Sequence, residues 1–417
     1  MARALTKESL LSDANFIKMA SQLYTSPIEE VAERYSALSE GFKGEVYLFS
    51  SPGRAELIGN HTDHNHGLVI AASIDMDVAA VVQKTNDRSI TIKSVGFDPF
   101  TISLDDLEVD KSKYGKSQSL CKGVCKGFLD RGYKVGGFVA VTKSTIFRGA
   151  GVSSSAAFEL LMCEILNVLY NDGQISVVDK AIISRFAENV YFGKPSGLMD
   201  QLTISRGGVS YMDFKKEVPD STGAPWNFDD LSLVIINCGG DHCDLTDEYA
   251  AIRYEMNSVA KYFGKEVLID VSEKEFYDKL PELKKEFTGR ALLRAMHFFD
   301  ENSRVQNTLN VLSKNDKDSF LELIKESGRS SYMYLQNCYP TGDKAQSVPL
   351  ALAIVSKNQD TLAYRVHGGG FAGTILCFVD SNKVGNYTTE MKKFFGDENV
   401  FDVKIRKFGA ITIALSK

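Results

Sequence analysis

A glycine-rich turn that leads into a long apolar helix constrains this chain more than any other feature. In FRGAGVSSSAAFELLMCEILNVLY, residues 147–170, Gly149 and Gly151 flank one alanine, three serines follow, and a helical pattern begins at Ala156. Backbone N–H groups and the positive end of the helix dipole both favour an anion at such a turn. The turn therefore predicts a phosphate site, and one of its serine hydroxyls could also bind Mg2+.

Two common phosphate-binding sequences do not fit this turn. It is not a Walker A sequence, because no Gly-Lys-Ser/Thr follows, and it is not a Rossmann fingerprint, because the third glycine is absent. The alternative to a phosphate site is a helix whose N-terminus is simply capped by the serine run.

A second polar stretch lies upstream, at residues 51–67 (SPGRAELIGNHTDHNHG). Pro52-Gly53 and Ile58-Gly59 punctuate it, which predicts a loop rather than a continuous helix or strand. A loop rich in Arg, His, Asp and Asn between apolar strands is typical of a small-molecule pocket wall. A solvated polar loop is the alternative. Three histidines (61, 64 and 66) fit no standard zinc spacing, and His297, in a helical run, is expected to be packed.

Sheet dominates the pattern of the first half. Between residues 45 and 142, strand-like runs occupy residues 46–49, 69–74, 78–82, 90–92, 100–104 and 137–142, and one probable helix lies at residues 117–131. After the helix that begins at Ala156, another is predicted at residues 176–191. This order favours an antiparallel or mixed sheet over a doubly wound parallel one. Residues 1–44 are expected to form an amphipathic helical extension packed on the core, with a capping box at Ser26-Pro27-Ile28-Glu29.

Length and charge bound the remaining possibilities. The chain has 417 residues, enough for two domains, and a loosening of composition after residue 208 suggests domains at 45–215 and 216–417. A net charge of −6 argues against nucleic acid or an anionic membrane as the main partner. Asp75 and Asp77 interrupt the best candidate for a membrane span. Seven scattered cysteines and no apolar leader favour a reducing cytoplasm.

Five segments in this order resemble the GHMP small-molecule kinases and, within them, the galactokinases. They are GR-x-x-L-I-G-x-H-T-D (53–63), GVSSSAA (151–157), GLMDQ (197–201), DLTDEYAAIR (244–253) and RVHGGGFAG (365–373). The resemblance spans residues 45–417. It implies an α+β fold with an N-terminal domain like ribosomal protein S5 domain 2 and a C-terminal ferredoxin-like domain, the active site lying in the cleft between them.

The resemblance also implies a reaction, the ATP-dependent phosphorylation of the anomeric hydroxyl of galactose. We expect the protein to be a monomer. Carried over position by position, Asp200 is the catalytic carboxylate and Arg54 its partner. The implied sugar contacts are Asn60, His61, Asp63, Gly197 and Tyr249. The implied nucleotide contacts are Gly149, Ala150, Gly151, Val152, Ser153, Ser154 and Ser155, and Ser155 with Glu188 would hold Mg2+.

Asp200 could act in two ways. It could remove the sugar proton as a general base, but an ordinary Asp pKa of about 3.9, lowered further by Arg54, makes it a weak one. Phosphoryl transfer usually passes through a loose transition state, so orienting the hydroxyl and accepting its proton late is the favoured role.

Some positions depart from the family pattern. Asn60 replaces the usual Glu, His64 a Tyr, His367 a Thr and Ala372 a Gly. Loss of a charge-assisted hydrogen bond at position 60 would weaken sugar recognition by roughly 1.5–3 kcal/mol. A related sugar-1-kinase, acting on a C6-modified sugar or N-acetylgalactosamine, is therefore the alternative function. Other GHMP kinase activities and a non-catalytic galactose sensor are less favoured, the latter because Ser155, Ala156 and Asp200 are intact.

Overall fold

The strands of this protein form two sheets. The structure, a computed structural model, describes residues 5–146, 151–239, 245–371 and 373–416. Within these residues, the larger sheet has the order β12-β1-β2-β5-β3-β4, with β6 pairing to β2 and β7 to β6. Its strands are β1 (Tyr47–Ile58), β2 (Leu68–Lys84), β3 (Ser89–Ser94), β4 (Phe100–Ser103), β5 (Phe138–Ser144), β6 (Val209–Asp213), β7 (Asp220–Ala224) and β12 (Ile411–Ile413). Only β3 and β5 pair in parallel among these described strands, so the predicted mixed sheet is confirmed.

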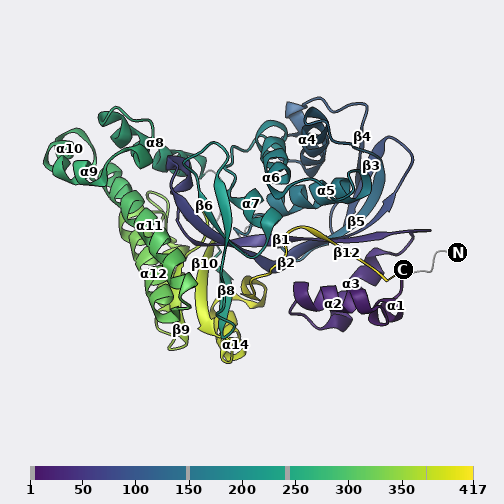
Figure 1. Cartoon of the computed structure of the whole chain (residues 1–417). Coiled ribbons are helices and arrows are strands. Elements are labelled where there is room, and N and C mark those ends of the chain that lie inside the picture. The colour runs from purple at the N-terminus through teal and green to yellow at the C-terminus, as the bar shows by residue number, and fades with distance from the viewer. Residues whose placement is uncertain (1–4, 147–150, 240–244, 372, 417) are drawn as a thin grey trace.

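Helices cover both faces of the larger sheet (Figure 1). One face packs against α4 (Ser117–Asp130), α5 (Ser154–Tyr170), α6 (Val177–Phe186) and α7 (Met199–Arg206). The helical extension packs on the other face through α1 (Lys7–Leu11), α2 (Ala14–Leu23) and α3 (Ile28–Leu38). Alternation along β2 explains the division: Ala80 and Val82 join the first core, whereas Ala79 and Val81 join the second.

Two local predictions about these elements are wrong. Residues 51–58 are not a loop, because β1 continues through them in antiparallel pairing with β2. Register shifts at Pro52/Gly53 and Glu56/Ile58 are bulges that accommodate the proline and glycine without ending the strand. The predicted capping box is also absent, because Pro27 itself is the N-cap of α3 and the helix start has no side-chain cap.

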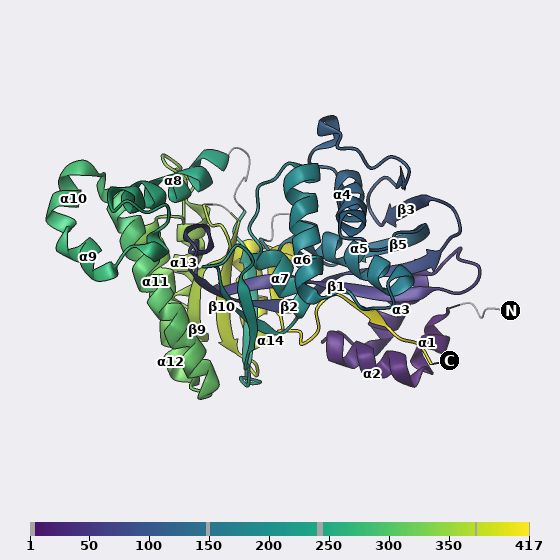
Figure 2. The ribbon, with the colours of Figure 1, turned by 45° about the horizontal axis from the view of Figure 1, so that its top comes forward.

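The smaller sheet is antiparallel, in the order β11-β8-β10-β9. Its strands are β8 (Leu231–Asn237), β9 (Thr361–Val366), β10 (Thr374–Asp380) and β11 (Val400–Val403). Helices α12 (Lys317–Ser330), α13 (Ser347–Val355) and α14 (Val384–Phe395) pack against it. A separate core is shared by α8 (Thr246–Tyr262), α9 (Glu273–Asp278), α10 (Leu280–Glu286) and α11 (Gly289–Ser313). In Figure 2, α8–α10 lie at one end of the molecule and α1–α3 at the opposite end.

Division between the two sheets does not follow chain order. Both β7 and β12 come after residue 215, yet they pair in the larger sheet. The division proposed at residue 215 therefore does not coincide with the division between the sheets. Two π-helical turns also interrupt the helices: η3 (Ala187–Phe192) follows α6, and η5 (Ser331–Leu335) follows α12.

Short 3-10 turns complete the described elements: η1 (Asp63–Asn65), η2 (Lys111–Lys113), η4 (Leu268–Asp270) and η6 (Asp397–Asn399). Within the described ranges, no helix combines the length and apolar character that crossing a membrane requires. The described cysteines are free thiols, and Cys121 and Cys125 are buried on α4.

Candidate active site

An arginine–aspartate pair lies where β1, α7 and the glycine-rich turn meet. Arg54 on β1 places its Nε 2.6 Å from Oδ1 of Asp200, which lies in the first turn of α7. Ser153 donates its hydroxyl to the other Asp200 oxygen, and Arg54 also donates to the Gly151 carbonyl. The two predicted catalytic residues are therefore in direct contact and joined to the predicted phosphate turn.

The surroundings of Asp200 favour its charged form. Burial raises its pKa, but the charge of Arg54 and hydrogen bonds from Ser153 and Arg54 outweigh burial, so the pKa lies below its ordinary value. An ionised carboxylate accepts hydrogen bonds well but is a weak base. This electrostatic state agrees with the orienting role favoured above.

Residues 151–155, the described part of the predicted phosphate turn, lead into the N-terminus of α5. Ser153 adopts a left-handed backbone, φ 61° and ψ 62°, at the N-cap of α5, and its side chain makes no cap hydrogen bond. The hydroxyl turns to Asp200 instead, so the alternative of a serine-capped helix is wrong. The helix N-terminus keeps its unsatisfied N–H groups for an anion. The predicted positions Gly149 and Ala150 lie outside the described residues.

Gly151 brings the second sheet close to this turn. Its φ is 64°, and an added Cβ would lie 3.0 Å from Oγ1 of Thr374 at the start of β10. A Cβ on Gly368 would lie 3.5 Å from the Gly151 carbonyl oxygen. The glycine-rich segment before β10 therefore approaches the phosphate turn closely, as the resemblance implied.

A cluster of oxygen atoms surrounds Glu188 beside this turn. Glu188, held on η3, accepts hydrogen bonds of 2.8 Å from Ser155 to Oε1 and of 2.8 Å from Gln201 to Oε2. Next to it, both carboxylate oxygens of Glu159 and Oε1 of Gln201 are buried without a donor from the described residues. Burial and the charge of Glu188 raise the pKa of Glu159 well above its ordinary value.

This donor set fits a small hard cation. Mg2+ prefers oxygen ligands and commonly takes one or two carboxylates, with substrate phosphates and water completing the shell. No group of three or more His, Cys, Asp or Glu side chains arranged for metal binding occurs in the described ranges, so an all-protein metal cage is not present there. Ser155 and Glu188 are therefore suited to a cation that arrives with a nucleotide.

The predicted sugar contacts divide into a half-buried group and one fully buried residue. His61 and Tyr249 stack with ring centroids 6.2 Å apart, and each is anchored to the glycine segment. Nε2 of His61 lies 2.8 Å from the Gly369 carbonyl, and the Tyr249 hydroxyl donates to the Gly370 carbonyl at 3.1 Å. A Cβ on Gly197 would lie 3.1 Å from Oδ2 of Asp63, so these two predicted contacts are neighbours as well.

Asn60 is more deeply buried than these residues. It is fully buried, and its Nδ2 donates to Glu56 Oε1 at 2.9 Å and to the Gly368 carbonyl at 2.7 Å. Its Oδ1 accepts from Asn337 at 2.8 Å and from Ser331 at 3.2 Å. All four hydrogen-bonding positions of the amide are thus used within the protein. The interpretation of Asn60 as a direct sugar contact finds no free polar atom to support it.

The network beneath Asn60 contains residues that the sequence did not single out. Arg365 contacts Glu56 at 3.2 Å and donates to the Leu57 carbonyl at 2.7 Å. Glu301 accepts from the Gly59 backbone at 3.0 Å, and its pKa is about 2 because nearby cations outweigh burial. Arg365 and Glu301 contact residues of β1 and the following turn that are hundreds of positions away in sequence, so no local sequence pattern could have identified these contacts.

Two histidines also belong to this interior. His297 is buried between the Asn60 carbonyl, at 2.9 Å, and Ser330, at 2.8 Å, which confirms that it is packed. Burial lowers its pKa to about 4. His367 accepts from the Glu56 backbone at 3.3 Å, and burial and then Arg54 lower its pKa well below the ordinary value. Both rings are held neutral.

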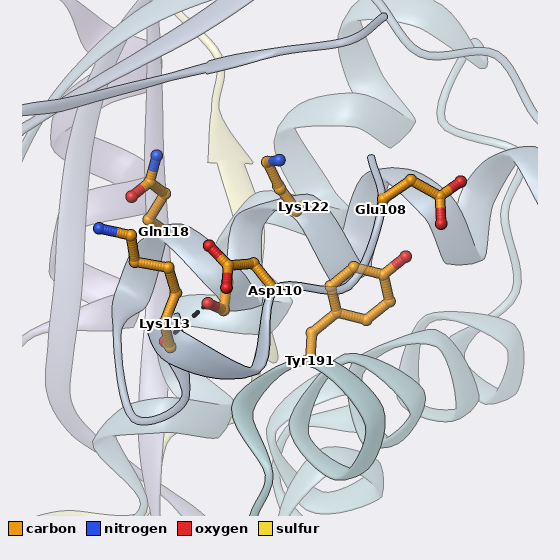
Figure 3. Close-up of a pocket in the computed structure, with 7 residues that line it drawn as sticks. Glu108, Asp110, Lys113, Gln118, Lys122 and Tyr191 are labelled. Atoms are coloured by element: carbon orange, nitrogen blue, oxygen red, sulfur yellow. Dashed lines mark hydrogen bonds between the residues drawn. The ribbon is translucent and has the colours of Figure 1, made fainter. Parts of the chain in front are cut away.

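A separate small cavity lies beside η3. It has a volume of about 60 Å³ and is lined by Glu108, Asp110, Lys113, Gln118, Ser119, Lys122 and Tyr191 (Figure 3). Pockets for drug-sized ligands typically enclose about 300–1,000 Å³. This cavity can hold a few water molecules but not a hexose or a nucleotide.

Comparison with known proteins places this architecture. Residues 37–84 match the model of the galactokinase galactose-binding signature, and residues 119–208 match that of the GHMP kinases N terminal domain. The chain is 31% identical over 357 residues to a galactokinase of Clostridium tetani, covering 82% of this chain and 86% of that protein. It is 32% identical over 352 residues to a galactokinase of Actinobacillus pleuropneumoniae, covering 82% and 88%.

Solved structures agree on the fold. The galactokinase of Lactococcus lactis, complexed with galactose, superposes with a TM-score of 0.78 at 22% identity, covering 92% of this chain and 99% of that one. The mevalonate kinase of Methanococcus jannaschii gives a TM-score of 0.63 at 15% identity, covering 87% and 99%. These matches confirm the predicted two-domain α+β GHMP kinase fold. With relatives at this level of identity over most of its length, the chain belongs to the galactokinase family.

Proposed function

We propose that this chain transfers the terminal phosphoryl group of ATP to the anomeric hydroxyl of galactose, giving galactose 1-phosphate and ADP. The observation that carries the proposal is the contact of Arg54, Asp200 and Ser153 at the N-terminus of α5. It places an ionised carboxylate and a guanidinium beside a helix end suited to phosphate. Membership of the galactokinase family supplies the sugar.

In this proposal, Asp200 accepts a hydrogen bond from the sugar hydroxyl and so directs the hydroxyl oxygen at the phosphorus atom of the terminal phosphate. Because its pKa is lowered, Asp200 takes the proton late, when bond formation has made the hydroxyl acidic. Arg54 holds Asp200 in place and stabilises negative charge that develops on the transferred group. Ser153 must release Asp200, or share it, when the sugar binds.

The N-terminus of α5 and the backbone of residues 151–155 would hold the nucleotide phosphates. Ser155 and Glu188 would hold Mg2+, which when bound neutralises phosphate charge. His61, Asp63, Gly197 and Tyr249 form the proposed sugar wall. Because the Asn60 amide is fully engaged below this wall, its difference from the family pattern does not by itself favour a C6-modified sugar.

A coupled ADP-release assay with ATP and Mg2+ tests the proposal. The panel holds galactose, glucose, N-acetylgalactosamine, galacturonate, fucose and arabinose, and phosphorus NMR locates the phosphate on the product. We expect turnover with galactose and phosphate on carbon 1. A preference for another sugar of the panel would refute galactose as the substrate, and ATP binding without turnover would refute the enzymatic function.

A further inference from the structure

A lysine without an assigned role, Lys194, contacts the proposed cation site. Gly193, with φ 78°, reverses the chain after η3, and the Lys194 backbone N–H donates to the Glu188 carbonyl at 3.2 Å. This turn brings Nζ of Lys194 to 3.0 Å from Oε1 of Glu188. The Lys194 side chain is 56% exposed, whereas that of Glu188 is 2% exposed. An accessible ammonium group thus covers a buried carboxylate.

The carboxylate oxygen that Lys194 contacts is the one that matters for a cation. Oε1 of Glu188 also accepts the Ser155 hydroxyl at 2.8 Å, while Oε2 is held by Gln201. A divalent cation bound by both Ser155 and Glu188 would therefore lie next to Oε1. The Lys194 ammonium now lies against the same oxygen.

Lys194 also acts on the catalytic side. Burial raises the pKa of Asp200. This pKa is lowered by the charge of Arg54, by hydrogen bonds from Ser153 and Arg54 and, last, by the charge of Lys194. Burial raises the pKa of Tyr249, a residue of the proposed sugar wall, and the charge of Lys194 lowers that pKa. Its ammonium is therefore within electrostatic reach of Glu188, Asp200 and Tyr249 together.

We propose that Lys194 takes the place of a divalent cation beside Glu188 when the protein is empty and contacts the terminal phosphate of the nucleotide when cation and nucleotide bind. The inference rests on the proposed kinase function. Two cations at one carboxylate oxygen repel each other, so Lys194 must move when the divalent ion arrives. Its flexible four-carbon stem and exposed position allow that movement, and the incoming nucleotide supplies a new anion for its ammonium group.

Manganese binding to the nucleotide-free protein tests the first half. Free Mn2+ is measured by electron paramagnetic resonance during titration of wild type, Lys194→Met and Lys194→Arg. The matched control is Lys383→Met, because Lys383 is also 56% exposed and ion-paired, at 2.6 Å to Asp360. We expect Lys194→Met to bind Mn2+ about tenfold more tightly, equivalent to about 1.4 kcal/mol. We expect the arginine and control variants to stay within about twofold of wild type. Equal affinity of Lys194→Met and wild type would overturn the proposal.

Steady-state kinetics test the second half. Lys194→Met should raise the KM for ATP at least about tenfold, leave the KM for the sugar unchanged, and be partly rescued in Lys194→Arg. An unchanged KM for ATP would overturn the phosphate contact. If wild type phosphorylated no sugar of the panel, the proposed function would fail, while the manganese titration would still decide whether Lys194 competes with a cation.

Discussion

Replacing Asn60 by Asp changes donors into acceptors without changing shape, so it isolates the role of the buried amide. The Asn60 side chain is fully buried, and its Nδ2 donates to Glu56 Oε1 at 2.9 Å and to the Gly368 carbonyl at 2.7 Å. Each buried acceptor left without a donor costs about 1–3 kcal/mol. The new carboxyl group, while protonated, can still donate to one of these two acceptors, so we expect Asn60→Asp to lower the free energy of unfolding by about 1–3 kcal/mol. The remaining contact of Arg365 with Glu56 favours the lower half of this range.

The loss should depend on pH. Two adjacent buried carboxyl groups cannot both ionise, and burial already raises the pKa of Glu56. The folded variant therefore keeps a proton that the unfolded chain releases near an ordinary Asp pKa of about 3.9. Because the folded state binds more protons, the free energy of unfolding falls as pH rises from there toward the raised pKa, by at most about 1.4 kcal/mol per unit.

Urea unfolding at pH 5.0 and pH 7.5, followed by circular dichroism, measures both effects. The matched control is Asn358→Asp, because the Asn358 amide donates to Glu390 at 2.8 Å in an exposed pair. There we expect a change within about 0.5 kcal/mol. Adding Glu56→Gln to Asn60→Asp restores a donor between the two side chains and should remove most of the pH dependence. A loss below about 0.5 kcal/mol at both pH values, or an equal loss at both, would refute the reasoning.

Three further predictions follow from the described contacts. Asp200→Asn should lower kcat by about 10²–10⁴ in protein that remains folded, and near-full turnover in the ADP-release assay would contradict the role given to Asp200. Gly151→Ala should lower the melting temperature and raise the KM for ATP, because φ is 64° and the new Cβ would meet Thr374 at 3.0 Å; unchanged values of both would refute the strain. Asp77→Asn should cost about 3–5 kcal/mol, because a buried carboxylate 2.8 Å from Arg34 is replaced by a neutral amide. A loss below about 1 kcal/mol in urea unfolding would show that this pair is dispensable.

Sequence and structure agree best where the determinants are local. The phosphate turn and α5 could be predicted because a glycine-rich turn, a serine run and a helical pattern are contiguous. Arg54 and Asp200 could be paired only through the family resemblance, since 146 positions separate them. The continuity of β1 through Gly53 was missed, because it depends on bulged pairing with β2 rather than on the residues of β1.

The surroundings of Asn60 could not be predicted from the sequence. Its Oδ1 partners, Ser331 and Asn337, lie 271 and 277 positions away, and Gly368, one of its two Nδ2 partners, lies 308 positions away. A single position compared with a family pattern carries no information about such partners. Lys194 was overlooked for a related reason: its importance arises from a turn that folds it back over Glu188, and a lone lysine in a loop gives no signal of this.

The pairing of β12 with β1 has a consequence for vectorial synthesis on the ribosome. Leu48 pairs with Ile413, so an emerging β1 must wait for more than 300 later residues before this edge is closed. Until then its N–H and C=O groups at residues 48–50 form an open edge that another nascent chain could extend. Arg406, which donates to Ser50 at 2.6 Å, arrives only with the same late segment. We therefore expect chains whose synthesis stops before residue 400 to require chaperone protection and to aggregate through β1. Such chains already contain every residue of the phosphate turn.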